Sequence, residues 1–127
     1  MKKIISTSKA PAAIGPYSQA IVVGDMVYTS GMIPIIPETG ELETGDIKAQ
    51  ANQAIKNLVT LLEEAGSDAA SVVKTTVFIK DMNDFAAVNE VYAAYFTENF
   101  PARSCVEVAR LPKDVKIEIE AVAVLKQ

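Results

Sequence analysis

The feature that most constrains the fold is an amphipathic helix pattern in the middle of the chain. Between Asp46 and Gly66, apolar residues recur at spacings of three and four, as on one face of an α-helix. These residues are Ile47, Ala51, Ala54, Ile55, Leu58, Leu61, Leu62 and Ala65. Asp46 is a favourable N-cap and Gly66 a favourable terminator. The pattern predicts one long helix whose apolar face packs against another layer.

The segments around this helix carry strand patterns instead. Two runs joined at Gly24-Asp25 predict a tight hairpin, because glycine readily adopts positive φ. Prolines and glycines interrupt Lys9–Pro16 and Ile33–Gly45, which are therefore expected to be loops. The expected strands are Ile4–Ile5, Ser18–Val23, Met26–Ser30, Val72–Lys80, Arg103–Ala109 and Lys116–Leu125.

A second helix is expected from Asn83, taken as its N-cap, to a point before Pro101. The element order is then β, β, β, α, β, α, β, β. It predicts an α/β (α+β) domain over residues 1–127, with a single mixed β-sheet and two helices packed on one face.

One face of that sheet would remain uncovered. In the last strand, Ile117 and Ile119 belong to an apolar row suited to the helices, yet the opposite row also ends in the apolar Val122 and Val124. This pattern favours burial of the second face by other subunits. Cover by a loop of the same chain is the alternative.

Composition excludes several kinds of chemistry. The 127 residues carry 12 Lys and Arg against 16 Asp and Glu, a formal charge of −4, which argues against a general nucleic-acid binder. Cys105 is the single cysteine and histidine is absent, which excludes His-ligated zinc, CxxC sites and imidazole-dependent triads. We see no signal peptide and expect a cytoplasmic protein without membrane contact.

Charge complementarity suggests a register for the last two strands. If they form a hairpin with Glu107 opposite Lys116, then Cys105 faces Glu118 and Arg103 faces Glu120. This register would gather the four residues on one partly buried face, and buried charges need partners or a ligand. We therefore expect a site at a subunit interface.

Each candidate residue also has a structural interpretation. Arg103 would pair with Glu120, Glu118 would be a solvated strand carboxylate, and Cys105 would be an inert apolar residue, since no histidine is present to activate it. Tyr17, Ser30 and Asn89 are uninformative individually. The pattern alone supports only an anion-accepting arginine near a carboxylate.

Two motifs extend this interpretation. Residues 101–112 read PARSCVEVARLP and continue through KIEIE at 116–120, while residues 10–19 read APAAIGPYSQ. With these motifs the chain resembles the reactive intermediate deaminase family, the RidA-type imine deaminases. The resemblance implies a chorismate-mutase-like fold and a homotrimer with a central barrel and intersubunit clefts.

The resemblance also implies an activity. It is the hydrolysis of enamines and imines such as 2-aminoacrylate and 2-iminopropanoate to 2-keto acids and ammonia, the reaction of a 2-iminobutanoate/2-iminopropanoate deaminase, with no cofactor or metal. Arg103 would bind the substrate carboxylate and Glu118 would handle water and protons. The other implied pocket residues are Tyr17, Ser30, Gly31, Asn89 and Cys105.

Two departures and two competing functions remain. Met32 stands where many members carry Gln, which predicts the loss of a polar contact near the pocket rim and a changed substrate range. The segment Thr97–Phe100 is shorter than in some members, which predicts an altered lip of the cleft with Arg103 still in place. A non-catalytic trimer that binds small carboxylates or serves regulation is the main alternative. Endoribonuclease activity ranks third, because an acidic chain without histidine lacks the usual acid–base pair.

Overall fold

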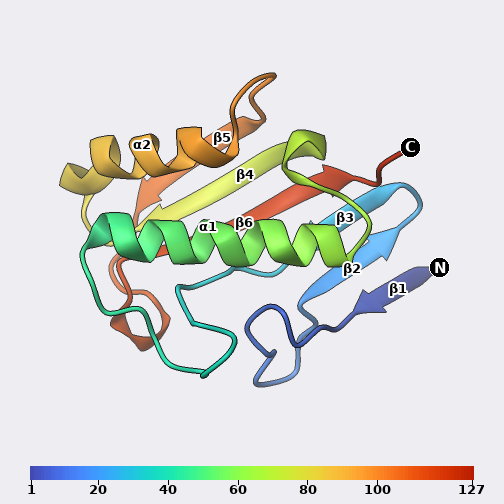
Figure 1. Cartoon of the computed structure of the whole chain (residues 1–127), viewed down its shortest axis with the longest axis horizontal. Coiled ribbons are helices and arrows are strands. Elements are labelled where there is room, and N and C mark those ends of the chain that lie inside the picture. The colour runs from blue at the N-terminus through green and yellow to red at the C-terminus, as the bar shows by residue number, and fades with distance from the viewer.

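The computed structural model describes all 127 residues and has one six-stranded sheet with both helices on the same face (Figure 1). The strand order is β1-β2-β3-β6-β4-β5. The strands are β1 (Lys2–Ile5), β2 (Ala20–Val23), β3 (Met26–Thr29), β4 (Val72–Ile79), β5 (Ala102–Glu107) and β6 (Ile117–Val124). The helices are α1 (Ile47–Glu64) and α2 (Phe85–Tyr95), with 3₁₀ turns η1 (Ala69–Ser71), η2 (Met82–Asp84) and η3 (Pro112–Asp114). The predicted mixed sheet with two helices on one face is confirmed.

Helix α1 forms as its pattern predicts. The Asp46 side chain accepts a hydrogen bond from Ala49 N at 2.9 Å, which satisfies one of the free N–H groups of the first turn. Gly66 follows the helix with a φ of 94°, a conformation that favours glycine. The apolar face of α1 packs on the sheet, with Ile55, Leu58 and Leu61 fully buried.

The start of α2 differs from the prediction. Asn83 is not an N-cap: Asp81 accepts a hydrogen bond from Asn83 N at 2.9 Å and caps the turn η2, which precedes the helix. Asp84 lies at the first boundary of α2 without a side-chain capping bond. The chain therefore begins to coil two residues earlier than the N-cap pattern suggested, through a 3₁₀ turn.

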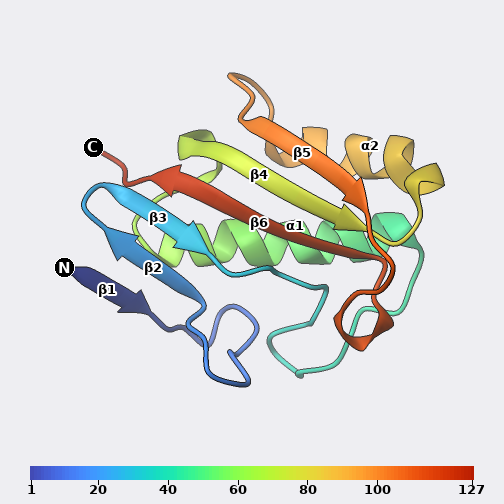
Figure 2. The same ribbon diagram turned by 180° about the vertical axis from the view of Figure 1, so that it is seen from behind.

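The predicted hairpin between the last two strands is wrong. Strand β4 lies between β5 and β6, parallel to β5 and antiparallel to β6 (Figure 2). The crossover through α2 places β5 parallel to β4, and β6 then occupies the other edge of β4. Cross-strand charge pairs contribute only about 0.2–1 kcal/mol each, which is less than the gain from burying Val77 and Ile79 of β4 in the centre of the sheet.

The face of the sheet away from the helices is open, as Figure 2 shows. Along β6, the residues that face the helices are buried, whereas Glu118, Glu120, Val122 and Val124 are only partly buried. Tyr28 of β3, paired with Val122, is 46% exposed. Loops of the same chain reach the Glu118 end of this face but leave Tyr28 exposed, so they do not cover the face as that alternative required. No helix has the length and apolar character needed to cross a membrane.

Candidate active site

Glu118 of β6 lies in a cavity of about 540 Å³, here called the Glu118 pocket. Its walls come from the loop before β2, the segment after β3 and the turn η3. The lining residues are Pro11, Ala12, Ile14, Tyr17, Ser30, Gly31, Met32, Ile33, Ile35, Pro112, Lys113 and Glu118. The predicted site residues Tyr17, Ser30, Gly31 and Glu118 thus come together around one cavity.

Gly31 is the close neighbour of the Glu118 side chain. A Cβ atom at position 31 would lie 2.7 Å from Cδ and 2.9 Å from Cγ of Glu118, closer than Cβ contacts normally come. The carboxyl group therefore occupies the space that any other residue at position 31 would need. The missing side chain at Gly31 thus leaves the room that the Glu118 carboxyl occupies.

The surroundings of Glu118 also change its acidity. Burial raises the pKa of the Glu118 carboxyl above its ordinary value, and the negative charge of Glu120 on the same strand raises it further. A half-buried carboxyl of this kind can exchange a proton closer to neutral pH than a solvated glutamate can. The interpretation of Glu118 as a fully solvated strand carboxylate is therefore wrong.

Gln19 holds the loop that forms one wall of this pocket. Its buried side chain accepts a hydrogen bond from Thr7 N at 2.7 Å and donates to Pro11 O at 2.7 Å. Its backbone carbonyl accepts from Ser30 N at 2.8 Å, and Ser30 Oγ donates to Ser18 O at 2.6 Å. Gln19 was not predicted as a site residue, because its anchoring role depends on these tertiary contacts of its buried amide.

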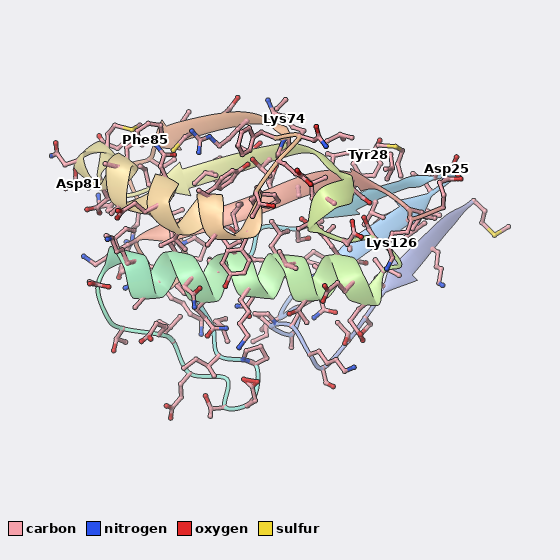
Figure 3. The ribbon with its side chains drawn as sticks, turned by 45° about the horizontal axis from the view of Figure 1, so that its top comes forward. Asp25, Tyr28, Lys74, Asp81, Phe85 and Lys126 are labelled. Atoms are coloured by element: carbon pink, nitrogen blue, oxygen red, sulfur yellow. The ribbon has the colours of Figure 1, made fainter.

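Arg103 of β5 lies in a second group of residues, here called the Arg103 cluster. Its Nη1 donates to Asn89 Oδ1 of α2 at 2.7 Å, and its guanidinium lies 5.3 Å from the ring centre of Phe85 and 4.9 Å from that of Tyr92. Figure 3 marks Phe85 at the start of α2. The structure has no Arg103–Glu120 ion pair. Arg103 is therefore oriented by helix α2.

The Arg103 cluster opens to a separate cavity of about 460 Å³. Its lining residues are Asn89, Tyr92, Ala93, Phe96, Phe100, Pro101 and Arg103. Phe100, at its rim, is 70% exposed. The guanidinium is thus available to an anion that enters from this side.

Cys105 lies two residues after Arg103 and points to the same face of the sheet, where its pairing partner is the buried Val77. Burial raises the pKa of the Cys105 thiol, and the opposing effect of the Arg103 charge is smaller. The thiol is therefore protonated near neutral pH and is a poor nucleophile.

The expectation that Arg103, Cys105 and Glu118 share one face is wrong. Arg103 lies across from Thr75 and Thr75 from Ala121, so these three side chains face the helices. Glu118 lies across from Phe78 on the open face. Within one chain, the Arg103 cluster and the Glu118 pocket are on opposite sides of the sheet.

The sequence profile of the family described as Endoribonuclease L-PSP matches residues 7–125. The chain belongs to this family. A 2-iminobutanoate/2-iminopropanoate deaminase of Escherichia coli (strain K12) is 60% identical over an alignment of 127 positions, which covers 98% of this chain and 98% of the relative. These findings confirm the resemblance that the two motifs indicated.

Solved structures of similar proteins agree with the fold. A Thermotoga maritima protein gives a TM-score of 0.97 at 54% identity and covers 100% of both chains. E. coli TdcF with bound serine gives a TM-score of 0.93 at 52% identity, covering 98% of this chain and 99% of the other. This L-PSP family chain therefore shares its fold with these solved structures. It has no group of three or more His, Cys, Asp or Glu side chains arranged to hold a metal ion.

Proposed function

We propose that the chain is an imine deaminase that hydrolyses 2-imino acids of the 2-iminobutanoate/2-iminopropanoate type to 2-keto acids and ammonia. The observation that carries this proposal is the Glu118 carboxyl, half-buried in a cavity and held beside Gly31, with its pKa raised. A protein that only binds carboxylates has no need of such a group. The name of the E. coli relative supports the same activity.

The reaction needs one water molecule and proton transfers. Water adds to the C=N carbon of the protonated imine and one proton of that water passes to the Glu118 carboxylate, which leaves a carbinolamine with a neutral NH2 group. Glu118 then gives this proton to the nitrogen. As the C–N bond breaks, the carbinol hydroxyl loses its proton back to Glu118, and the products are a 2-keto acid and ammonia. An enamine such as 2-aminoacrylate first takes a proton on its terminal carbon to become the imine.

Arg103 is proposed to hold the substrate carboxylate. A guanidinium makes two parallel hydrogen bonds to a carboxylate, and Asn89, Phe85 and Tyr92 already orient it. The serine bound to the related TdcF is a small molecule with such a carboxylate. Cys105 is proposed to lie beside the substrate without acting as a nucleophile.

A complete site requires a second copy of the chain, because Arg103 and Glu118 lie on opposite faces of one sheet. We propose a homotrimer in which the open faces cover one another and each cleft takes Glu118 from one subunit and Arg103 from the next. Exposed apolar residues on the open face, such as Tyr28 and Val106, support this assembly. The cytoplasmic location stays a prediction.

The experiment uses 2-aminoacrylate made in situ by a serine dehydratase in the presence of semicarbazide. The purified protein should suppress semicarbazone formation while keto acid still accumulates, and Glu118→Gln, which keeps the size of the side chain, should not. If the wild-type protein binds the keto acid but leaves semicarbazone formation unchanged, the non-catalytic carboxylate-binding function replaces this proposal.

The family description raises a second activity, cleavage of RNA. The same protein preparation should therefore be incubated with a single-stranded RNA. We expect no cleavage above that of Glu118→Gln, because the chain has a net charge of −4 and no histidine for acid–base catalysis. Cleavage that disappears in Glu118→Gln would instead assign the site to RNA hydrolysis.

A further inference from the structure

The connection between β5 and β6 has an unusual backbone at the edge of the Glu118 pocket. Lys113 and Asp114 have φ values of 56° and 57°. Residues with a side chain rarely adopt positive φ, and two in succession persist only where the surroundings fix them. Strain of this kind concentrates at functional sites, so the role of this turn needs an explanation.

Anchors on both sides fix the turn. Leu111 and Val115 are buried, and Asp114 N donates to Leu111 O at 3.0 Å. Arg110 Nε forms an ion pair with Asp114 Oδ1 at 2.9 Å. Lys113 is exposed, like its neighbours Pro112 and Asp114, and its ammonium has no hydrogen bond or ion pair.

Lys113 supplies the positive charge that this chain itself places at the Glu118 pocket. It is the only cationic residue among those that line the Glu118 pocket, and Glu118 is the only acidic one. Arg103 of the same chain is on the other face of the sheet. A 2-imino acid is an anion, and it must approach a chain of net charge −4 towards a face that carries both Glu118 and Glu120. Without a local cation, this approach is unfavourable.

We infer that Lys113 is a steering residue whose ammonium draws the carboxylate of the 2-imino acid, and that of the 2-keto acid product, to the mouth of the Glu118 pocket, where the proposed Arg103 of the next subunit holds it. This inference rests on the proposed function for the identity of the anion. The strained turn fixes the backbone of Lys113 at the pocket edge, so the charge is placed before the substrate arrives. Lys113 moves no proton and takes no part in breaking the C–N bond.

The test compares Lys113→Gln and Lys113→Arg with wild type, and uses Lys116→Gln as the matched control. Lys116 is exposed, lies three residues away and does not line the pocket, so Lys116→Gln changes the net charge as much as Lys113→Gln does but removes no charge from the pocket.

Lys113→Gln should raise KM for the imine and Kd for 2-oxobutanoate roughly 3- to 10-fold at low salt, with kcat within about twofold. The loss should shrink at about 0.5 M salt, since screening weakens exposed charges. Lys113→Arg and Lys116→Gln should behave like wild type.

Three results would overturn the inference: wild-type KM and Kd in Lys113→Gln, an equal loss in Lys116→Gln, or a loss that salt does not change. If Lys113→Gln lowers the melting temperature, Lys113→Asn replaces it, because asparagine tolerates positive φ and is neutral.

Calorimetric measurement of keto-acid binding separates this inference from the proposed function. Keto-acid binding that depends on Lys113, in a protein that does not hydrolyse imines, would support the inference and overturn the deaminase. Absence of both hydrolysis and binding would overturn both.

Discussion

The Arg103 cluster and the Glu118 pocket are built from different kinds of structure. Arg103 is held between a strand and a helix by Asn89, Phe85 and Tyr92, and the Tyr92 hydroxyl is in turn bonded to Thr75 Oγ1 at 2.8 Å. The Glu118 pocket has only its floor on a strand, and its walls are loops. The arginine side is therefore preorganised by packing, whereas the glutamate side depends on a few exact fits such as that of Gly31.

This difference indicates where each half is vulnerable. A rigid carboxylate-binding arginine reduces the entropy that substrate binding costs, and it belongs on packed elements. The acid–base group has to admit water and substrate, and loops can line such an opening. Substitutions in the Arg103 cluster should therefore act on binding and stability, and substitutions of Glu118 and of its neighbour Gly31 on turnover.

The largest expected effect comes from separating the two halves on different subunits. Arg103→Ala and Glu118→Gln should each lower imine hydrolysis by about 10²-fold or more, because each removes one half of every site. When the two variants are unfolded together and refolded as a mixture, about a quarter of wild-type activity should return, since one interface in four joins an intact Arg103 to an intact Glu118. The semicarbazide assay measures the recovery.

The matched control is a mixture of Glu118→Gln with the double variant Arg103→Ala/Glu118→Gln, which has no intact Glu118 and should stay inactive. A 1:1 mixture of the two single variants that also stays inactive, although light scattering shows mixed trimers, would mean that both residues act within one chain. The opposite-face geometry would then need a different explanation.

The next effect is confined to the Glu118 pocket. Gly31→Ala places a Cβ in the space of the Glu118 side chain and should displace the carboxyl, lowering kcat roughly 10- to 100-fold. The melting temperature should change little, because Glu118 is half-buried and its side chain can rotate away. Stopped assays of keto acid formation over a range of imine concentrations separate kcat from KM.

A double-mutant cycle shows whether Gly31 acts through Glu118. In the Glu118→Gln background, Gly31→Ala should cause little further loss, because there is no ionisable group left to displace. If the two losses multiply, Gly31 contributes independently, for instance through its backbone, and its role as a positioning residue for Glu118 is wrong.

A smaller effect distinguishes the Arg103 cluster. Tyr92→Phe keeps the ring beneath Arg103 but leaves the buried Thr75 hydroxyl without its partner, which should lower the free energy of unfolding by about 1–3 kcal/mol. Tyr95→Phe is the control: its hydroxyl donates to Asn52 Oδ1 at 2.6 Å at an exposed position, so its loss should be smaller. Urea unfolding measures both, and equal losses would argue against a prebuilt cluster.

The sequence predicted the elements of both halves but not their placement. The α1 helix and the apolar row of β6 were predicted because period and caps are local properties. The β5–β6 hairpin was wrong because strand order depends on the crossover through α2, which competes with cross-strand charge pairing over the whole sheet.

The same limit applies to the site residues. Glu118 was named from the strand pattern and the resemblance, and Tyr17, Ser30 and Gly31 from the resemblance, and the structure places all four around one cavity. Gln19 and Lys113 were missed because their roles depend on tertiary contacts: a buried amide that anchors a loop, and a backbone with positive φ. Positive φ at a non-glycine residue leaves no reliable signal in a single sequence.

The smallest expected effect tests the environment of Glu118 through the pH dependence of stability. Because its pKa is raised in the folded chain, the folded state binds a proton more tightly than the unfolded state, and unfolding releases protons in the range between the ordinary and the raised pKa. The free energy of unfolding should therefore fall as pH rises through that range, and stay lowered above it.

Glu118→Gln removes the buried charge, so its free energy of unfolding should exceed that of wild type near neutral pH. This difference should shrink as the pH falls towards the ordinary glutamate pKa. Glu120→Gln should reduce the pH dependence only in part, because burial is the larger cause of the shift. Urea unfolding of wild type and both variants across this range gives the comparison, and parallel pH profiles for wild type and Glu118→Gln would show that the Glu118 carboxyl is solvated in the folded protein.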